Sequence, residues 1–149
     1  MSVEVRQAGP TDASAWAALR QALWPEENPE RHLPDIAAML ARPGTAVAFL
    51  ALEQQRVVGF AEATLRRDYV NGTNSSPVGF LEGWYVEEAF RRKGIGRALI
   101  AAIERWTVMQ GCSELASDAM SDNLDGHVAH AACGFEETDR VVYFRKRLD

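Results

Sequence analysis

The sequence predicts an α/β fold with a mixed sheet, mostly antiparallel around a parallel β-α-β core, and with helices on both faces. The length of 149 residues suits one domain with a sizeable core, so residues 1–149 are expected to form a single domain. A hydrophobic content of 47% and a charged content of 25% are typical of a soluble globular protein. Apolar runs with strand character alternate with stripes at helical spacing. The strand–helix–strand unit over residues 80–118 should be a right-handed parallel crossover, whereas the earlier hairpins are antiparallel.

The first half of the chain predicts three strands and two helices. Thr11 is a suitable cap for a helix that ends at Leu23, because Trp24 precedes Pro25. A second helix should end before Pro43-Gly44. The predicted elements are a strand at 3–8, helices at 11–23 and 33–41, and strands at 46–52 and 57–65 joined by a hairpin at 53–56.

The second half predicts the parallel unit and a final helix and strand. A polar loop covers residues 71–77, and Gly111 and Gly134 each follow a helical pattern. One apolar stripe at helical spacing contains Ile95, Ala98, Leu99, Ala102, Ile103 and Trp106. The predicted elements are a strand at 80–86, a helix at 95–110, a strand at 113–118, a helix at 123–132 and a closing strand at 141–147.

Composition argues against several classes of function. A net charge of −5 argues against nucleic acid as the main partner. No apolar run approaches the roughly 20 residues of a membrane span, and residues 1–6 lack a signal-peptide core, so we expect a cytoplasmic protein without a membrane partner. Cys112 and Cys133 read as reduced thiols, and the three histidines do not cluster with them. No structural metal is expected.

The most informative motif is Arg91-Arg92-Lys93-Gly94-Ile95-Gly96, between an apolar strand and the long amphipathic helix. The first N–H groups of a helix have no partner within the helix, and the helix dipole favours an anion there. Glycines let a ligand approach the backbone, and the basic side chains add positive charge. The motif predicts a diphosphate site; the alternative is only a basic helix start. It has neither the three glycines of a dinucleotide fingerprint nor the Gly-Lys-Ser/Thr ending of a P-loop.

The motif resembles the Arg/Gln-x-x-Gly-x-Gly/Ala pyrophosphate loop of the GNAT superfamily of N-acetyltransferases, which bind acetyl-CoA. The predicted order of elements is also the GNAT order over the whole chain. Several blocks are similar to one subgroup, the aminoglycoside 6′-N-acetyltransferases. These blocks are residues 23–25, 68–72, 75–77, 80–83, 111–118, 134–138 and 140–146.

The resemblance implies where acetyl-CoA binds. Gly83 lies inside an apolar strand, where a glycine indicates a bulge or a point at which a ligand approaches the backbone. The alternative is that this glycine only relieves tight packing. The residues implied to contact the acyl donor are the strand residues Trp84, Tyr85 and Val86, the loop residues Arg91, Arg92, Lys93, Gly94, Ile95, Gly96 and Arg97, and also Asn123 and His130. Asn123 is equally suited to cap a helix. His130 stands where many relatives carry Tyr, and the alternative is an ordinary helix histidine.

The acceptor amine must lose a proton before it attacks, because primary amines titrate near pH 10. Glu82 and Asp118 are the candidate catalytic and ammonium-binding carboxylates; Asp118 is also suited to cap the following segment. Trp24 and Tyr69 are candidates for the wall of the acceptor site, although core packing is the default for isolated aromatics. The resemblance implies a homodimer in which the second subunit contributes acidic residues near the acceptor, and Glu136 or Glu137 is the candidate for that role.

The expected function is transfer of acetyl from acetyl-CoA to the 6′-amine of an aminoglycoside, by direct attack in a ternary complex. Neither cysteine has an evident activating His–acid set, so no acyl-enzyme is expected. Acetylation removes a positive charge from the antibiotic and should confer resistance. The alternatives are acetylation of another amine, such as a polyamine, a peptide N-terminus or lysine, and a non-catalytic acyl-CoA sensor.

Overall fold

The computed structural model describes residues 3–149; Met1 and Ser2, which fall in the segment used above to argue against a signal peptide, lie outside the described residues. The chain divides into two compact units, of which the first ends at Ser117 and the second runs from Asp118 to Asp149. Each unit is described by itself. The single domain expected over residues 1–149 stays a prediction.

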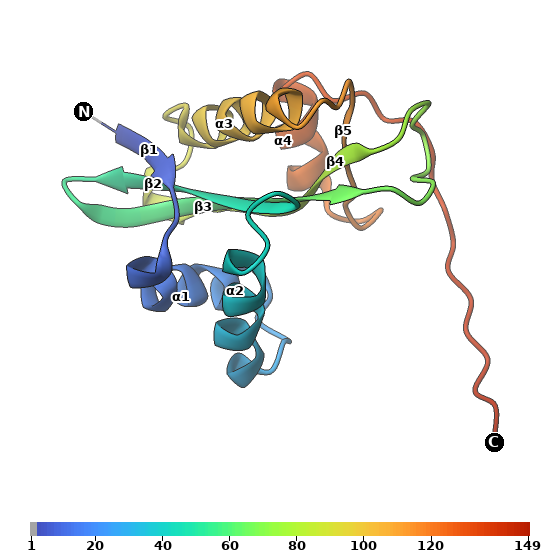
Figure 1. Ribbon diagram of the computed structural model, residues 1–149, viewed down its shortest axis with the longest axis horizontal. Coiled ribbons are helices and arrows are strands. Elements are labelled where there is room, and N and C mark those ends of the chain that lie inside the picture. Colours follow the sequence, from blue (N-terminus) through green and yellow to red (C-terminus); the bar gives the residue numbers. More distant parts are fainter. Residues whose placement is uncertain (1–2) are drawn as a thin grey trace. The chain divides into compact units, whose positions relative to one another are not determined.

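The first unit is built on a five-stranded mixed sheet in the order β1-β2-β3-β4-β5 (Figure 1). Neighbouring strands are antiparallel from β1 to β4, and β5 pairs with β4 in parallel. This confirms the predicted sheet. The strands are β1 (Val3–Gln7), β2 (Ala46–Glu53), β3 (Arg56–Arg66), β4 (Val78–Val86) and β5 (Leu115–Ser117).

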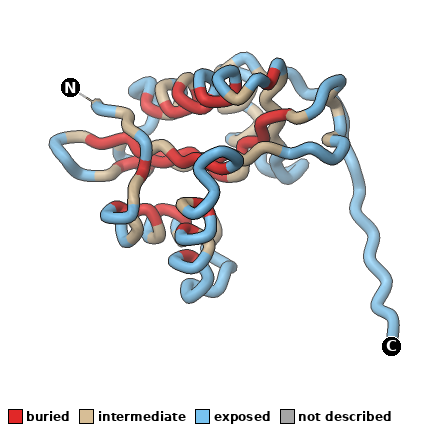
Figure 2. The backbone as a smooth tube through the Cα atoms, viewed as in Figure 1, coloured by how far each residue is buried: buried red, intermediate tan, exposed pale blue. Residues whose placement is uncertain are grey.

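Helices cover both faces of this sheet (Figure 1). One face carries α1 (Ala13–Leu23) and α2 (His32–Leu40), and the other carries α3 (Ile95–Met109). Short 3-10 turns lie at Pro10–Asp12, Pro29–Arg31 and Glu88–Phe90. Buried residues concentrate in the central strands and on the sides of the helices that face them (Figure 2). The apolar stripe predicted for the long helix is its buried side: Ile95, Leu99, Ala102, Ile103 and Trp106 are all buried.

An irregularity interrupts the pairing of β3 with β4. Glu62 is opposite Gly83, and the next residue of β3, Ala63, is opposite Leu81, so Glu82 is an extra residue with no partner in the register. Such a bulge bends a strand and redirects a side chain. The sequence placed an irregularity at Gly83, and the structure has it at the adjacent Glu82.

The second unit contains the helix α4 (Leu124–Ala132) and an extended tail. Asn123 caps the helix, because its Oδ1 accepts a hydrogen bond of 3.0 Å from the Gly126 amide. Gly134 follows the helix with a φ of +89°, a conformation that favours glycine. Both features agree with the predicted helix boundaries.

Two local predictions are wrong. Thr11 does not cap α1, because Pro10 begins a 3-10 turn one residue earlier and Asp12 occupies the cap position; the Asp12 carboxylate accepts from the Gly9 amide at 2.8 Å. The predicted strand at 141–147 is absent, and this segment is exposed without regular structure (Figure 2). The β-branched and aromatic residues at 141–144 favour an extended segment, but a strand forms only where a partner edge is supplied.

Candidate active site

Glu82 is fixed by two residues of the neighbouring strand β3. Thr64 Oγ1 donates a hydrogen bond of 2.6 Å to Oε2 of Glu82. The Arg66 guanidinium donates to both carboxylate oxygens, at 2.9 Å to Oε1 and 3.0 Å to Oε2 through Nη2. The Glu82 side chain is 28% exposed and that of Arg66 is 44% exposed, so the pair lies at the surface of the sheet. Arg66 also covers the Phe80 ring, with its Cζ 3.6 Å from the ring centroid.

Trp24, at the end of α1, packs directly over the bulge. A Cβ atom at Gly83 would lie 2.8 Å from Cη2 of Trp24, so only glycine leaves room for this indole. Trp24 also makes an edge contact with the Phe60 ring at 6.4 Å between centroids. The structure therefore brings two residues from the sequence-based set to the same bulge: Glu82 is its extra residue, and Trp24 packs over the next residue, Gly83.

A second arginine–carboxylate pair lies deeper under the same helices. Glu62 is 2% exposed; its Oε1 accepts from Trp16 Nε1 at 2.9 Å and lies 2.8 Å from Arg20 Nε. Burial raises the pKa of Glu62, although the Arg20 charge and the Trp16 hydrogen bond oppose that change. The Arg20 guanidinium in turn lies 5.1 Å from the Trp24 ring centroid. The buried pair thus contacts the Trp24 ring through Arg20 and helps to hold it in place.

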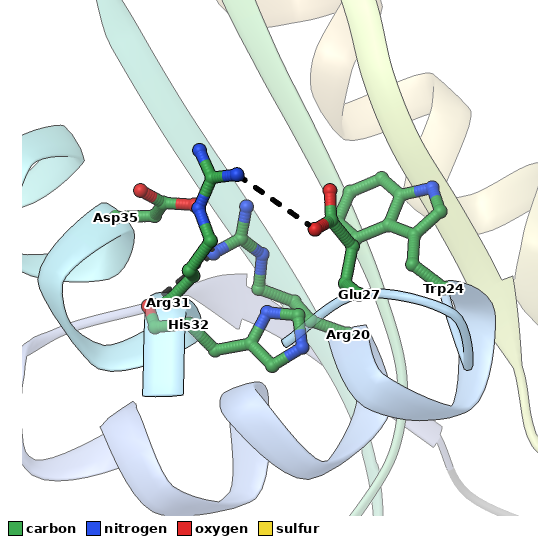
Figure 3. Close-up of a pocket in the computed structure, with 6 residues that line it drawn as sticks. All are labelled: Arg20, Trp24, Glu27, Arg31, His32 and Asp35. Carbon is green, nitrogen blue, oxygen red and sulfur yellow. Dashed lines mark hydrogen bonds and ion pairs between the residues drawn. The ribbon is translucent and has the colours of Figure 1, made fainter. Parts of the chain in front are cut away.

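A polar pocket of about 150 Å³ adjoins Trp24 (Figure 3). Arg31 spans it and approaches Glu27 at 3.9 Å, shown by the dashed line in Figure 3. Of the residues singled out in the sequence, only Trp24 lines this pocket. The lining residues are Arg20, Trp24, Glu27, Arg31, His32 and Asp35.

Tyr69 lies in the loop between β3 and β4 and is 77% exposed. This loop is fastened to the start of β5 by Glu114, whose Oε1 accepts from the Asn74 amide at 2.9 Å and from the Ser75 hydroxyl. The Ser75 hydrogen bond lowers the pKa of Glu114 below its usual range. Because Tyr69 is exposed, it does not pack in the core, which was the alternative to a place in the wall of the acceptor site.

The start of α3 has the form expected of an anion cradle. Gly94 occupies the cap position with a φ of +82°, and the helix has no side-chain cap there. The basic loop residues Arg92 and Lys93 are exposed. Arg91 is partly committed elsewhere, because its Nε donates to the Val86 carbonyl at 2.7 Å.

Gly96 packs closely against Trp84, a contact that the sequence did not reveal. A Cβ at this position would lie 3.3 Å from the Trp84 ring, and Trp84 Nε1 donates to the Gly96 carbonyl at 3.2 Å. The first turn of α3 is therefore clamped onto β4. This contact holds the loop and the strand implied to bind the donor in one fixed arrangement.

The pairing of β4 with β5 is short. It covers only Gly79, Phe80 and Leu81, opposite Leu115, Ala116 and Ser117. The strand β4 continues to Val86, so the sheet ladder with β5 stops before the bulge and before the three residues Trp84, Tyr85 and Val86. Because β5 itself ends at Ser117, β4 runs on beyond this pairing, and an extended, amide-containing ligand can pair with a strand edge of this kind.

Arg97 is exposed in the first turn of α3, and the other sequence-based residues belong to the second unit. Asp118 follows β5 and is exposed, and Glu136 is exposed in the tail. The Nδ1 of His130 lies 2.6 Å from the Gly126 carbonyl of the same helix, and its ring meets Phe135 edge-on at 5.1 Å. The histidine therefore has a structural place in α4, and its role beside coenzyme stays a prediction. That Glu82 and Asp118 flank one cleft also stays a prediction.

Sequence reasoning missed Thr64, Arg66, Glu62 and Arg20. Alternate residues of a strand share one face, so the run from Glu62 to Arg66 held a usable signal. The bond from Arg66 to Glu82 depends on the register across two strands, which the sequence does not display. Among residues 3–149, no group of three or more His, Cys, Asp and Glu side chains could hold a metal ion. Within the same range, no helix has both the length and the apolar character of a membrane span.

Comparison with known proteins identifies close relatives. The sequence profile described as the acetyltransferase (GNAT) family matches residues 14–135. An aminoglycoside N(6′)-acetyltransferase type 1 of Stenotrophomonas maltophilia is 53% identical over 145 residues, covering 97% of this chain and 94% of that protein. A protein of the same name from Serratia marcescens is 51% identical, with 90% and 92% covered.

Solved structures agree with these relatives. The structure of AAC(6′)-Iy in complex with the bisubstrate analog CoA-S-monomethyl-acetylneamine has a TM-score of 0.94 and 42% identity, and the match covers 99% of this chain and 100% of that one. AAC(6′)-Ig from Acinetobacter haemolyticus has a TM-score of 0.92 and 40% identity, with 98% and 99% covered.

Proposed function

The chain belongs to the GNAT family of acetyltransferases, and we propose that it transfers the acetyl group of acetyl-CoA to the 6′-amine of an aminoglycoside. The observation that carries the substrate class is the 53% identity, over nearly the full length of both proteins, to an aminoglycoside N(6′)-acetyltransferase. The bisubstrate analog bound by AAC(6′)-Iy joins CoA to an aminoglycoside fragment, in line with a reaction through a ternary complex.

The residues at the start of α3 fit the donor. Uncapped helix amides, the left-handed Gly94 and the exposed side chains of Arg92 and Lys93 offer hydrogen bonds and positive charge to a pyrophosphate. Acetyl-CoA, as the acyl substrate, supplies acetyl as a thioester. Residues Trp84, Tyr85 and Val86 lie beyond the end of the β4–β5 pairing, where their strand is suited to pair with the pantetheine amides.

The acceptor is held by charge and by aromatic surface. The Glu82 carboxylate binds the 6′-ammonium and takes its proton, directly or through water, so that the free amine can attack the thioester carbon. Trp24, directly over the bulge, supplies a flat face beside that amine, and Tyr69 supplies a second one from the loop. The thiol leaves as a thiolate, which is tolerable because thiols titrate near pH 8.5.

The second unit completes the proposal. We expect Asp118 to act with Glu82 on the acceptor amine, Glu136 to add negative charge for other ammonium groups of the antibiotic, and Asn123 and His130 to contact the coenzyme. We assign the protein to the cytoplasm, where acetyl-CoA is available. We also infer a homodimer, in which the partner subunit's Glu136 reaches the acceptor site.

Product mapping tests this function. The purified protein is mixed with acetyl-CoA and kanamycin or tobramycin, and the product is examined by NMR. We expect one acetyl group, on the 6′-nitrogen. Acetylation of a polyamine or a peptide with no turnover of either antibiotic would replace the proposed substrate class. Binding of acetyl-CoA without any acetylated amine would indicate an acyl-CoA sensor. Gel filtration with light scattering tests the dimer.

A further inference from the structure

Two arginine–glutamate pairs lie on the face of the sheet covered by α1 and α2, and they differ in one respect. The pair of Arg20 with Glu62 is enclosed, with side chains 9% and 2% exposed. The pair of Arg66 with Glu82 is open to solvent, with side chains 44% and 28% exposed. Separating buried charges costs several kcal/mol, whereas an exposed pair separates easily because water takes over both partners. Only the second pair can exchange its cation.

Arg66 uses the same carboxylate oxygens that a substrate ammonium would need. It donates to both Oε1 and Oε2 of Glu82, while Thr64 donates to Oε2 alone. Departure of the guanidinium would leave one hydrogen bond to hold the carboxylate in place and would vacate one oxygen entirely. A primary ammonium has three donors and no acceptor, so it can replace the guanidinium at these oxygens.

The position of Arg66 allows it to leave. It is the last residue of β3 and precedes the loop over residues 67–77. Its guanidinium lies over the Phe80 ring, with Cζ 3.6 Å from the ring centroid, and that ring is otherwise buried. Movement of Arg66 toward solvent would uncover an aromatic face next to Glu82, where a sugar ring can pack.

We propose that Arg66 competes with the substrate for Glu82: its guanidinium pairs with the Glu82 carboxylate in the resting enzyme, and the 6′-ammonium of the acceptor displaces it. The inference rests on the proposed function, since it requires Glu82 to bind the acceptor amine. In this proposal Arg66 is a positioning and specificity residue. It keeps the Glu82 carboxylate oriented, and a cation that binds Glu82 weakly does not displace it.

The test is the variant Arg66→Gln, compared with Arg66→Lys. Removing the competing cation lowers the acceptor KM and the acceptor Kd by about two- to fivefold, since an exposed ion pair is worth up to about 1 kcal/mol and tenfold is 1.4 kcal/mol. The KM for acetyl-CoA stays within about twofold of the wild-type value. Lysine keeps the charge but loses the two-pronged bond to Glu82 and the stacking on Phe80. The acceptor KM and Kd of Arg66→Lys therefore lie between those of the wild type and those of Arg66→Gln. Plain long-range repulsion would leave Arg66→Lys equal to the wild type.

A matched control is Arg6→Gln. Arg6 also makes a two-pronged bond to a carboxylate, that of Asp12 at 2.8 and 2.9 Å, and is 40% exposed, but it lies on β1 at the far edge of the sheet. We expect no change in either KM from this variant. Neomycin and paromomycin give a second control, because they differ only in an amine or a hydroxyl at the 6′ position. The gain in affinity appears for neomycin and not for paromomycin.

The wild-type reaction is measured first, so that failure of the proposed function can be distinguished from failure of the role proposed for Arg66. Absence of aminoglycoside acetylation by the wild type would overturn the proposed function. With that activity present, unchanged or weaker acceptor binding in Arg66→Gln would overturn the role of Arg66. Weaker binding in both variants, in proportion to a fall in thermal stability, would show that Arg66 is a structural residue. An equal gain for neomycin and paromomycin would show that Arg66 does not compete with the 6′-amine.

Discussion

The substitution Gly83→Ala tests whether the contact between Trp24 and the bulge shapes the acceptor site. The added Cβ would lie 2.8 Å from Cη2 and 3.0 Å from Cζ2 of Trp24, and 3.4 Å from the Phe60 ring. Nonbonded carbon atoms in contact are about 3.5–4.0 Å apart, so the indole must move away by about 0.7–1.2 Å. Trp24 is the element that gives way, because it is only half-buried and Phe60 is fully buried.

Two effects follow from that displacement. Overpacking of this kind lowers the free energy of unfolding by about 1–3 kcal/mol. For a chain of this size the melting temperature then falls by about 3–9 °C. A retreat of the indole also removes it from the place where it supports the acceptor, so the acceptor KM rises about tenfold or more. The KM for acetyl-CoA is expected to stay nearly constant.

The assay combines thermal unfolding with steady-state kinetics in which each substrate is varied in turn. Gly44→Ala is the control, because a Cβ at Gly44 meets nothing within 4 Å. A double-mutant cycle with Trp24→Ala isolates the contact: in that background Gly83→Ala loses most of its cost, which gives a coupling of about 1–2 kcal/mol.

Two results would refute the reasoning. A variant with lower thermal stability but an unaltered acceptor KM would remove Trp24 from the acceptor site. Full additivity in the cycle would show that the cost of the methyl group arises elsewhere, for instance from Phe60.

Three further predictions concern the donor site, the second carboxylate and the fold. Arg91→Ala combined with Gly96→Asp weakens acetyl-CoA binding at least tenfold by calorimetry, because a negative charge enters the helix start; unchanged affinity would argue against the anion cradle. Asp118→Asn lowers turnover or acceptor affinity more than acetyl-CoA affinity, and a wild-type kinetic profile would remove Asp118 from the site. The hydrogen bonds from Arg6 hold the pKa of the Asp12 carboxyl below its usual range, so Asp12 stabilises the fold above about pH 4 and this contribution is lost as the pH falls through the lowered pKa. Asp12→Asn therefore lowers the free energy of unfolding by about 1–2 kcal/mol at pH 7, and in acid denaturation curves the difference from the wild type shrinks below about pH 4 and disappears once the pH is below the lowered pKa of Asp12; a constant difference across that range would contradict the role of the charge.

The sequence predicted the elements whose signals are local. Asn123 caps its helix, which was the alternative to coenzyme binding, and Gly134 ends that helix in the left-handed conformation, as a glycine at this position suggests. The apolar stripe of the long helix identified its buried side. Such features follow from a few neighbouring residues, because a cap or an amphipathic stripe is decided within one or two turns.

Features that depend on a partner were missed or mistaken. The tail at 141–147 has the composition of a strand but no strand in the structure, since the pattern says nothing about an available edge. The bond from Arg66 to Glu82 was missed because it depends on the cross-strand register, which the bulge changes. Sequence reasoning therefore found the carboxylate of the site but not the residue that occupies it.

The bulge explains how a carboxylate and an aromatic side chain come together in the middle of a sheet. In a regular strand, consecutive residues point to opposite faces. Here Glu82 reaches Thr64, while a Cβ on the next residue, Gly83, would meet Trp24, on the same face. Two consecutive positions are thus directed to the helix α1 side, which no unbroken ladder permits. The residue before the bulge, Leu81, is also the last to pair with β5. One extra residue in β4 therefore directs an acid and an indole toward the proposed acceptor, at the point where the strand becomes available to the donor. Deletion of Glu82 would restore the ladder and remove both properties together, whereas Glu82→Gln would keep the backbone and remove only the charge.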